Sequence, residues 1–142
     1  MSLGPAKAAI RAFLEACFGD APLVWPNETH TLPATPTAFV AVEVQGAVNA
    51  IRGVGDPGNR LFIHGGVILA HVFVPFGIGQ SAGDDLADAI GLLLTRKDIA
   101  APTLPQVVRT EDPSLRDGEL GSDDGNYWRV SVVVPFDFYY FG

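Results

Sequence analysis

The segment "NYWRVSVVVPFDFYYFG", residues 126–142, decides the fold class of this chain. It contains half of the aromatic residues, including all three tyrosines. From Trp128 to Phe138, apolar side chains recur at every second position, and residues such as Asp137 alternate with them. A period of two is typical of a β-strand that buries one face. The segment therefore predicts a core strand, and the aromatic residues 139–141 extend beyond what that strand needs.

The composition predicts a single domain over residues 1–142. Hydrophobic residues make up 48% of the chain and charged residues 18%, which is enough apolar material for a core and argues against disorder. The formal net charge is −7 and the basic residues are scattered, so we expect no surface that holds nucleic acid. No apolar run approaches the roughly 18 residues of a membrane span. The single cysteine, Cys17, excludes an internal disulfide.

Two helices are predicted from apolar side chains that recur at helical spacing. The first begins at Pro5 and ends near Gly19, and Cys17 belongs to its buried stripe. That stripe consists of Ile10, Phe13, Leu14 and Cys17. The second helix is predicted over residues 82–96, with Ser81 as its N-terminal cap. Its buried stripe consists of Leu86, Ile90, Leu93 and Leu94.

Strands are predicted over residues 39–44 and 67–75, with a short one within 103–109. Both faces of the strand at 67–75 are mostly apolar, which places it near the centre of a sheet. Residues 53–59 are predicted to form a flexible turn, and residues 110–126, with six acidic side chains, a loop. The order of elements predicts an α+β two-layer sandwich, with a mostly antiparallel or mixed sheet and two helices on one face.

Three short motifs raise the question of a catalytic or binding site. "GQSAG", residues 79–83, fits the nucleophile elbow of a hydrolase, with Ser81 as the nucleophile. In that elbow the histidine follows the serine, whereas all three histidines precede Ser81, so the capping role is favoured. "GVGDPG", residues 53–58, precedes a strand rather than the helix that a dinucleotide site requires. "SDDGN", residues 122–126, lacks the alternating acids of a calcium loop and is interpreted as a turn.

The remaining polar candidates are also given structural interpretations. We interpret Cys17 as a core cysteine, because no motif for a nucleophile accompanies it. His71 lies in a predicted strand without a partner at metal-ligand spacing, so it is interpreted as a hydrogen-bonded sheet histidine or a subunit contact. The residues therefore predict no catalytic, cofactor-binding or metal-binding group, and the chain is not expected to be an enzyme.

Several segments, taken in order, resemble a known family. They are "PLVWPN" (22–27), "FVAVEV" (39–44), "GGVILAHVFVPFGIG" (65–79), "DDLADAI" (84–90) and "YWRVSVVVPFDF" (127–138). Together they are similar to the tail terminator proteins of long-tailed bacteriophages, the lambda-type minor tail proteins and their prophage relatives. The resemblance spans residues 8–138. Its most specific parts are the strand that ends in Val-Pro before a Gly-x-Gly helix start, and the final aromatic-flanked strand.

The resemblance implies a structural protein of the virion tail that assembles in the host cytoplasm. Such proteins form a six-membered ring on the end of a finished tail tube, stop its polymerisation and present a surface to the head connector. The implied partners are further copies of the chain, the tail tube protein and a head connector or completion protein. DNA would only pass through the lumen, and no membrane or cofactor is implied. Another phage neck or tail-completion scaffold, or a small serine hydrolase using Ser81, remains as an alternative.

The aromatic end suggests where a ring would make its contacts. A proline at position 135 removes a ladder donor, so strand pairing is expected to weaken beyond it. Surplus aromatic side chains are typical of interfaces, and a closed ring shelters exposed sheet edges. Six copies would carry a charge of roughly −42, so the lumen would repel DNA. The residues expected at subunit contacts are Tyr139, Tyr140, Phe141, Arg52 and Arg109.

Overall fold

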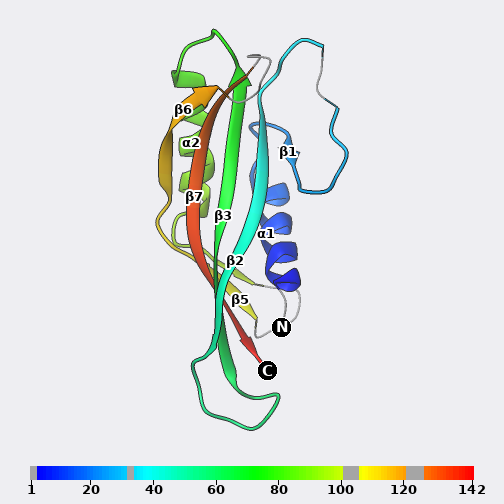
Figure 1. Cartoon of the computed structure of the whole chain (residues 1–142), viewed down its shortest axis with the longest axis vertical. Coiled ribbons are helices and arrows are strands. Elements are labelled where there is room, and N and C mark those ends of the chain that lie inside the picture. The colour runs from blue at the N-terminus through cyan, green and yellow to red at the C-terminus, as the bar shows by residue number, and fades with distance from the viewer. Residues whose placement is uncertain (1–2, 32–33, 101–105, 121–126) are drawn as a thin grey trace.

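The computed structural model describes residues 3–31, 34–100, 106–120 and 127–142. Two helices and seven strands form one curled layer of sheet and one layer of helices (Figure 1). In chain order they are α1 (Gly4–Cys17), β1 (Leu23–Val24), β2 (Phe39–Ile51), β3 (Leu61–Pro75), α2 (Ser81–Leu94), β4 (Asp98–Ala100), β5 (Val107–Thr110), β6 (Ser114–Leu120) and β7 (Tyr127–Phe141). The motif at 122–126 and the start of the strand predicted within 103–109 lie outside the described residues.

The two longest strands form the centre of the sheet. The strand order is β1-β2-β3-β7-β5-β4, and β6 also pairs with β7. Strands β3 and β7 pair antiparallel over their whole length, from Leu61↔Phe141 to Pro75↔Tyr127. Only β1 is parallel to its neighbour, and it covers just two residues of β2. The sheet is therefore mixed but mostly antiparallel, and the predicted central position of the strand at 67–75 is confirmed.

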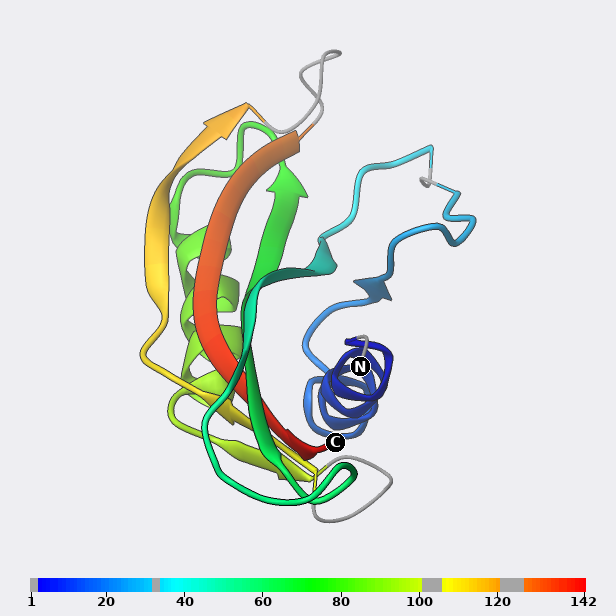
Figure 2. The ribbon, with the colours of Figure 1, turned by 60° about the horizontal axis from the view of Figure 1, so that its bottom comes forward.

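One face of the sheet and both helices share a single core. The register places Val42, Ala70 and Val132 side by side across β2, β3 and β7, and all three are buried. Ile10 and Leu14 of α1 and three residues of α2 belong to the same buried cluster. Those three are Ala87, Ile90 and Leu94. Figure 1 shows both helices behind the sheet, and Figure 2 shows the curl of β7, so the α+β prediction with two helices on one face is confirmed.

Gly66 leaves room for the ring of Phe136 on the neighbouring strand β7. A Cβ at Gly66 would lie 2.7 Å from Cζ of Phe136, its register partner, and 2.5 Å from the carbonyl oxygen of Gln45. Contacts this short are not tolerated, so any side chain there would displace the ring or the β2 backbone. Glycine at this position therefore allows the fully buried Phe136 to fill the centre of the core.

The expectation that strand pairing weakens beyond Pro135 is wrong. The ladder between β3 and β7 continues through Tyr139 and Tyr140 to Phe141. The carbonyl of Pro135 accepts a hydrogen bond of 2.8 Å from the backbone N–H of Glu111, in the bend between β5 and β6. In an antiparallel strand the N–H and C=O of one residue point to the same side. The missing N–H of Pro135 therefore faces this bend and not β3, and the long ladder is unaffected.

Two further predictions about local structure are wrong. Cys17 is exposed, because the buried stripe of α1 continues from Leu14 to Phe18 at a spacing of four residues and leaves Cys17 outside it. Residues 114–120 form strand β6 rather than part of a loop. The charged side chains of this segment are typical of a loop, but they also occur in edge strands. Among the described residues, β6 pairs with β7 along one side and lies at an edge of the sheet.

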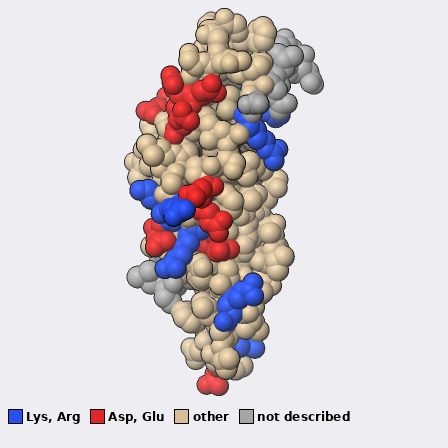
Figure 3. All heavy atoms as spheres, turned by 90° about the vertical axis from the view of Figure 1, so that its left-hand side faces the viewer, with Lys and Arg blue, Asp and Glu red and all other residues tan. Residues whose placement is uncertain are grey.

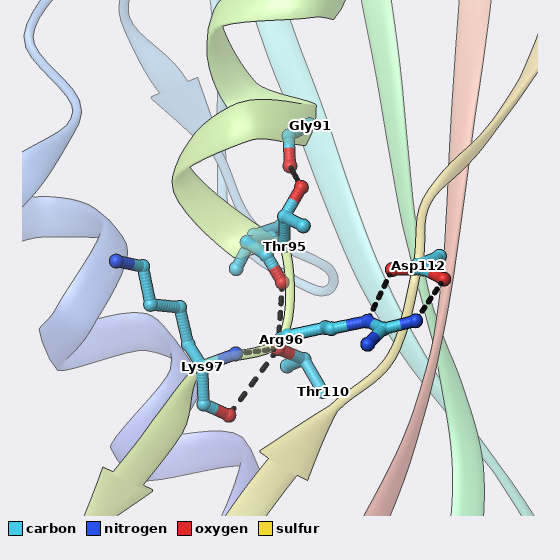
Figure 4. A network of polar contacts seen from close by, with 7 residues as sticks. Gly91, Thr95, Arg96, Lys97, Thr110 and Asp112 are labelled. Atoms are coloured by element: carbon cyan, nitrogen blue, oxygen red, sulfur yellow. Dashed lines mark hydrogen bonds and ion pairs between the residues drawn. The ribbon is translucent and has the colours of Figure 1, made fainter.

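The C-terminus of α2 is capped by a side chain from strand β5 (Figure 4). The hydroxyl of Thr110 donates to the carbonyl of Leu94 at 2.6 Å and accepts from the backbone N–H of Lys97 at 2.7 Å. Arg96, between them, has a left-handed backbone with φ 46°, and its guanidinium pairs with Asp112. Hydrogen bonds from Arg96 hold the pKa of the Asp112 carboxyl below its usual value, but both side chains are exposed and the pair contributes little stability.

We expect Thr110→Val to lower the free energy of unfolding by about 1–3 kcal/mol, because it leaves the buried C=O of Leu94 and the partly buried N–H of Lys97 without their partner. Thr95→Val is the matched control, since Thr95 only donates to the carbonyl of Gly91 in its own helix. That control should change the free energy by less than about 0.5 kcal/mol. Urea unfolding measures both values, and equal losses for the two variants would contradict the capping role.

Candidate interaction surfaces

The face of the sheet opposite the helices, called the open face here, carries a second set of side chains. At one end Phe39 stacks on Phe73 with ring centroids 4.7 Å apart, and Tyr127 meets both rings edge-on. Further along, Leu69 and Val133 are register partners and are only partly buried. Neither helix covers these apolar groups, so Phe39, Phe73, Leu69 and Val133 stay partly exposed on the open face.

A polar row crosses the open face between these apolar groups. His71 of β3 lies between Ser131 of β7 and Glu43 of β2, with Nδ1 2.8 Å from Ser131 Oγ and Nε2 3.2 Å from Glu43 Oε1. An ionised carboxylate only accepts hydrogen bonds, so Nε2–H donates to Glu43, and in the neutral imidazole Nδ1 then accepts from the Ser131 hydroxyl. His71 is thus a hydrogen-bonded sheet histidine, one of the two roles predicted for it. The sequence did not reveal its partners, because they depend on the register of three strands.

The polar row has the residue types of a serine hydrolase but not the setting of one. A nucleophilic serine needs nearby N–H groups that are free to stabilise an oxyanion. Ser131 is 8% exposed and lies in the middle of β7, paired with His71 on one side and Arg116 on the other. Its backbone groups belong to the sheet, so the row stabilises the alignment of three strands.

Ser81 is not a helix cap. Gln80 occupies the N-cap position of α2 and no side chain there makes a capping hydrogen bond. Gly77 and Gly79 turn the chain into the helix with left-handed φ angles of 92° and 91°. Ser81 becomes the first helical residue and its side chain is exposed. The contacts described for His71 go to Glu43 and Ser131, so this histidine does not serve Ser81 as a base.

We expect Ser81→Ala to change the free energy of unfolding by less than about 0.5 kcal/mol, because an exposed first-turn serine without a capping bond contributes little. Alanine also has the higher helix propensity. Urea unfolding of the purified variant measures the change. A loss near 1 kcal/mol, the value typical of a removed cap, would contradict the geometry described.

Beyond a bulge between Gly46 and Asn49, the hairpin of β2 and β3 forms an arm, residues 47–63. Figure 1 shows the arm projecting past the rest of the molecule, at the end where the C-terminus lies. Its side chains Val48, Ile51 and Val54 are 71%, 52% and 106% exposed. Three exposed aliphatic side chains on a projecting hairpin form a candidate surface for contact with another protein.

The C-terminal aromatic residues brace this arm. Tyr140 is buried, stacks on its register partner Phe62 with centroids 5.3 Å apart, and donates from its hydroxyl to Asn49 Oδ1 at 2.9 Å. Gly142 completes the attachment, because its N–H and C=O both bond to the backbone of Arg60. The aromatic end therefore connects both strands of the arm to the core, a role that the sequence alone did not indicate.

The five residues predicted at subunit contacts lie in different environments. Tyr140 is in the core of the single chain, where a partner cannot reach it. Phe141 is 45% exposed at the base of the arm, and Arg52 is exposed just after β2. Arg109 lies over the Tyr139 ring at 5.3 Å and pairs with Asp98 at 3.3 Å. Contact of Tyr139, Phe141, Arg52 and Arg109 with another subunit stays a prediction.

We expect Tyr140→Ala to lower the free energy of unfolding by about 3 kcal/mol or more, because it leaves a cavity beside Phe62. Phe141→Ala, the exposed neighbour, should cost less than about 1 kcal/mol. Urea unfolding gives both values. Faster hydrogen exchange at residues 49–51 and 61–63 in the Tyr140 variant alone would show that the arm has lost its brace, and unchanged exchange would contradict that role.

The charged side chains are unevenly distributed over the surface. On the side formed by β6 and α2, acidic groups gather in one area, and mixed charges lie below it (Figure 3). The exposed acids Asp84, Asp85 and Asp88 of α2 belong to this side of the fold. Among the described residues, no group of three or more His, Cys, Asp and Glu could hold a metal ion. No helix in the described part of the chain is long and apolar enough to cross a membrane.

No protein-family model matches this chain, and no curated protein matches it. A solved structure that carries no functional name has a similar fold, with a TM-score of 0.70 and 20% sequence identity. The alignment covers 100% of this chain and 99% of that chain. At this level of identity the likeness shows a shared fold over the whole length and nothing about function.

Proposed function

We propose that this chain is a structural protein of the tail terminator type from a long-tailed phage or prophage. In this proposal several copies, six by the resemblance, form a ring that caps the tail tube. The ring ends tube polymerisation and offers its other side to the head connector. The observation that carries the proposal is the braced arm, because exposed aliphatic side chains such as Val48, Ile51 and Val54, gathered on one projecting hairpin, are typical of a surface that another protein covers.

The arm is both accessible to a partner and held in a fixed orientation. Its apolar side chains project beyond the domain, where a tube subunit can bury them without rearrangement of the core. The base of the arm is held by backbone bonds to Gly142 and by the Tyr140 side chain, so its orientation is set before binding. A pre-ordered element loses little conformational entropy on binding, which favours affinity.

The test measures binding to purified tail tubes by co-sedimentation and electron microscopy. Val48→Thr combined with Ile51→Thr should weaken capping about tenfold or more, because two apolar anchors are lost from the contact. Leu92→Thr is the matched control, since Leu92 is 76% exposed on α2, away from the arm. Wild-type protein that binds a head connector but not the tube would favour a neck scaffold, and binding to neither would contradict the proposal.

A further inference from the structure

The outer edge of β2 is free over most of its length. Beyond Ala41, no strand pairs with this edge in the part of the chain that the structure describes. The N–H of Val40 donates outward to the carbonyl of Pro22 at 2.9 Å. Because backbone groups alternate along a strand, Val42 and Val44 also turn their N–H and C=O outward. These groups form a ready template for another strand.

A second edge that has no paired strand among the described residues lies on the other side of the sheet, along β6. Pro135 directs its carbonyl toward the β5 and β6 side of β7, where it accepts from Glu111. Val133 and Ser131, two and four residues before Pro135, direct their backbone groups to the same side. Their register partners Ser114 and Arg116 therefore hydrogen-bond to β7. Leu115, between them, turns its backbone groups outward, and its side chain is 45% exposed. Figure 1 shows β6 and β2 on opposite sides of the β3–β7 pair.

The geometry points to pairing of the β2 edge of one copy with the β6 edge of the next copy, an inference that rests on the ring proposed above. Three antiparallel steps separate β2 from β6, so the two strands run in opposite directions within one chain. Rotation about an axis along the strands preserves these directions, and the new pair is antiparallel. Joining two different edges is a head-to-tail contact, which forms a closed ring when the rotation between neighbouring copies divides a full turn.

The side chains at the two edges match in shape. Val44 and Leu115 belong to the same face of the sheet, the one that carries the helices, because their register partners Ile68 and Val132 do. Beside Val44, this face has a pocket of about 310 Å³. It is lined by Lys7, Ala8, Arg11, Trp25, Pro26, Val42 and Val44. An exposed Leu115 from the next copy enters this apolar pocket when the strands pair, as side chains do in strand addition.

The charges at the two edges match as well. On the open face, exposed Arg116 of one copy comes beside Glu43 of the other, whose second carboxylate oxygen is not the one that bonds His71. On the helix face, Asp84 lines the groove that holds Leu115, and Lys7 lines the pocket that receives it. Opposite charges thus face each other on both sides of the new strand pair, which fixes its register.

Charge exchange tests the pairing of Glu43 with Arg116. Glu43→Arg alone and Arg116→Glu alone each place like charges together, so ring formation should need about tenfold more protein or fail. The double variant restores opposite charges at every contact and should recover the ring. Lys97→Glu is the control for Arg116→Glu, because it makes the same charge change away from both edges. Native mass spectrometry and electron microscopy measure assembly, and urea unfolding confirms that each variant is folded.

Val44→Pro tests the backbone pairing separately. It removes an N–H that points outward, so the ladder with β3 stays intact, and Val44→Ala controls for the lost side chain. Loss of the ring in the proline variant alone supports the inference. A ring that persists in the proline variant and in both single charge variants overturns this inference. A double charge variant that stays unassembled overturns it as well. Both outcomes leave the proposed function standing. Wild-type protein that forms no ring alone or on tail tubes overturns both.

Discussion

The antiparallel ladder between β3 and β7 is the interaction on which the rest of this structure depends. Fifteen residues of each strand pair without a break, so one long axis organises the core, the arm and the C-terminus. Along its inner face the ladder presents mostly β-branched and aromatic side chains, and both helices bury their apolar stripes against them. β-Branched residues suit such a surface, because their stiff side chains lose little entropy when they pack on a pleated sheet. The same ladder extends past the helices and carries the arm out into solvent.

One residue in this ladder explains why the sheet divides on one side. Pro135 has no N–H to offer, and the chain on that side bends at Glu111–Pro113 instead of running straight past it. Strand β6 then pairs with one half of β7, and β5 pairs with the other. The bend also brings Thr110 to the end of α2, where its hydroxyl satisfies backbone groups that the helix leaves open. A proline that the sequence marked as the end of pairing is in fact the point where the partner strand changes.

The sequence predicted those features that repeat along a strand or helix and missed those that depend on register. Alternation identified β2, β3 and β7 and the buried face of β7, because period two is a local property. The contacts of His71 with Ser131 and Glu43 needed the alignment of three strands, which no local pattern contains. Cys17 was misplaced because one residue at a helix end decides whether the stripe includes Cys17 or Phe18. Strand β6 was missed because charged residues and glycine are common both in loops and in edge strands.

The bulges in β2 and β6 limit how far the free edges can pair. In β2 the register shifts after Gly46, and in β6 it shifts after Arg116, so each edge offers only a short regular stretch. Natural proteins use bulges in this way to keep edge strands from aggregating, because a twisted edge accepts few hydrogen bonds. A contact this short is weak between two isolated copies but is strengthened when a ring closes. The last copy then makes two contacts while it loses its translational and rotational entropy only once. In our proposal the arm adds to this effect, since copies already held on a tube end meet at high local concentration. The same edges can therefore stay apart in free protein and join where the tube ends.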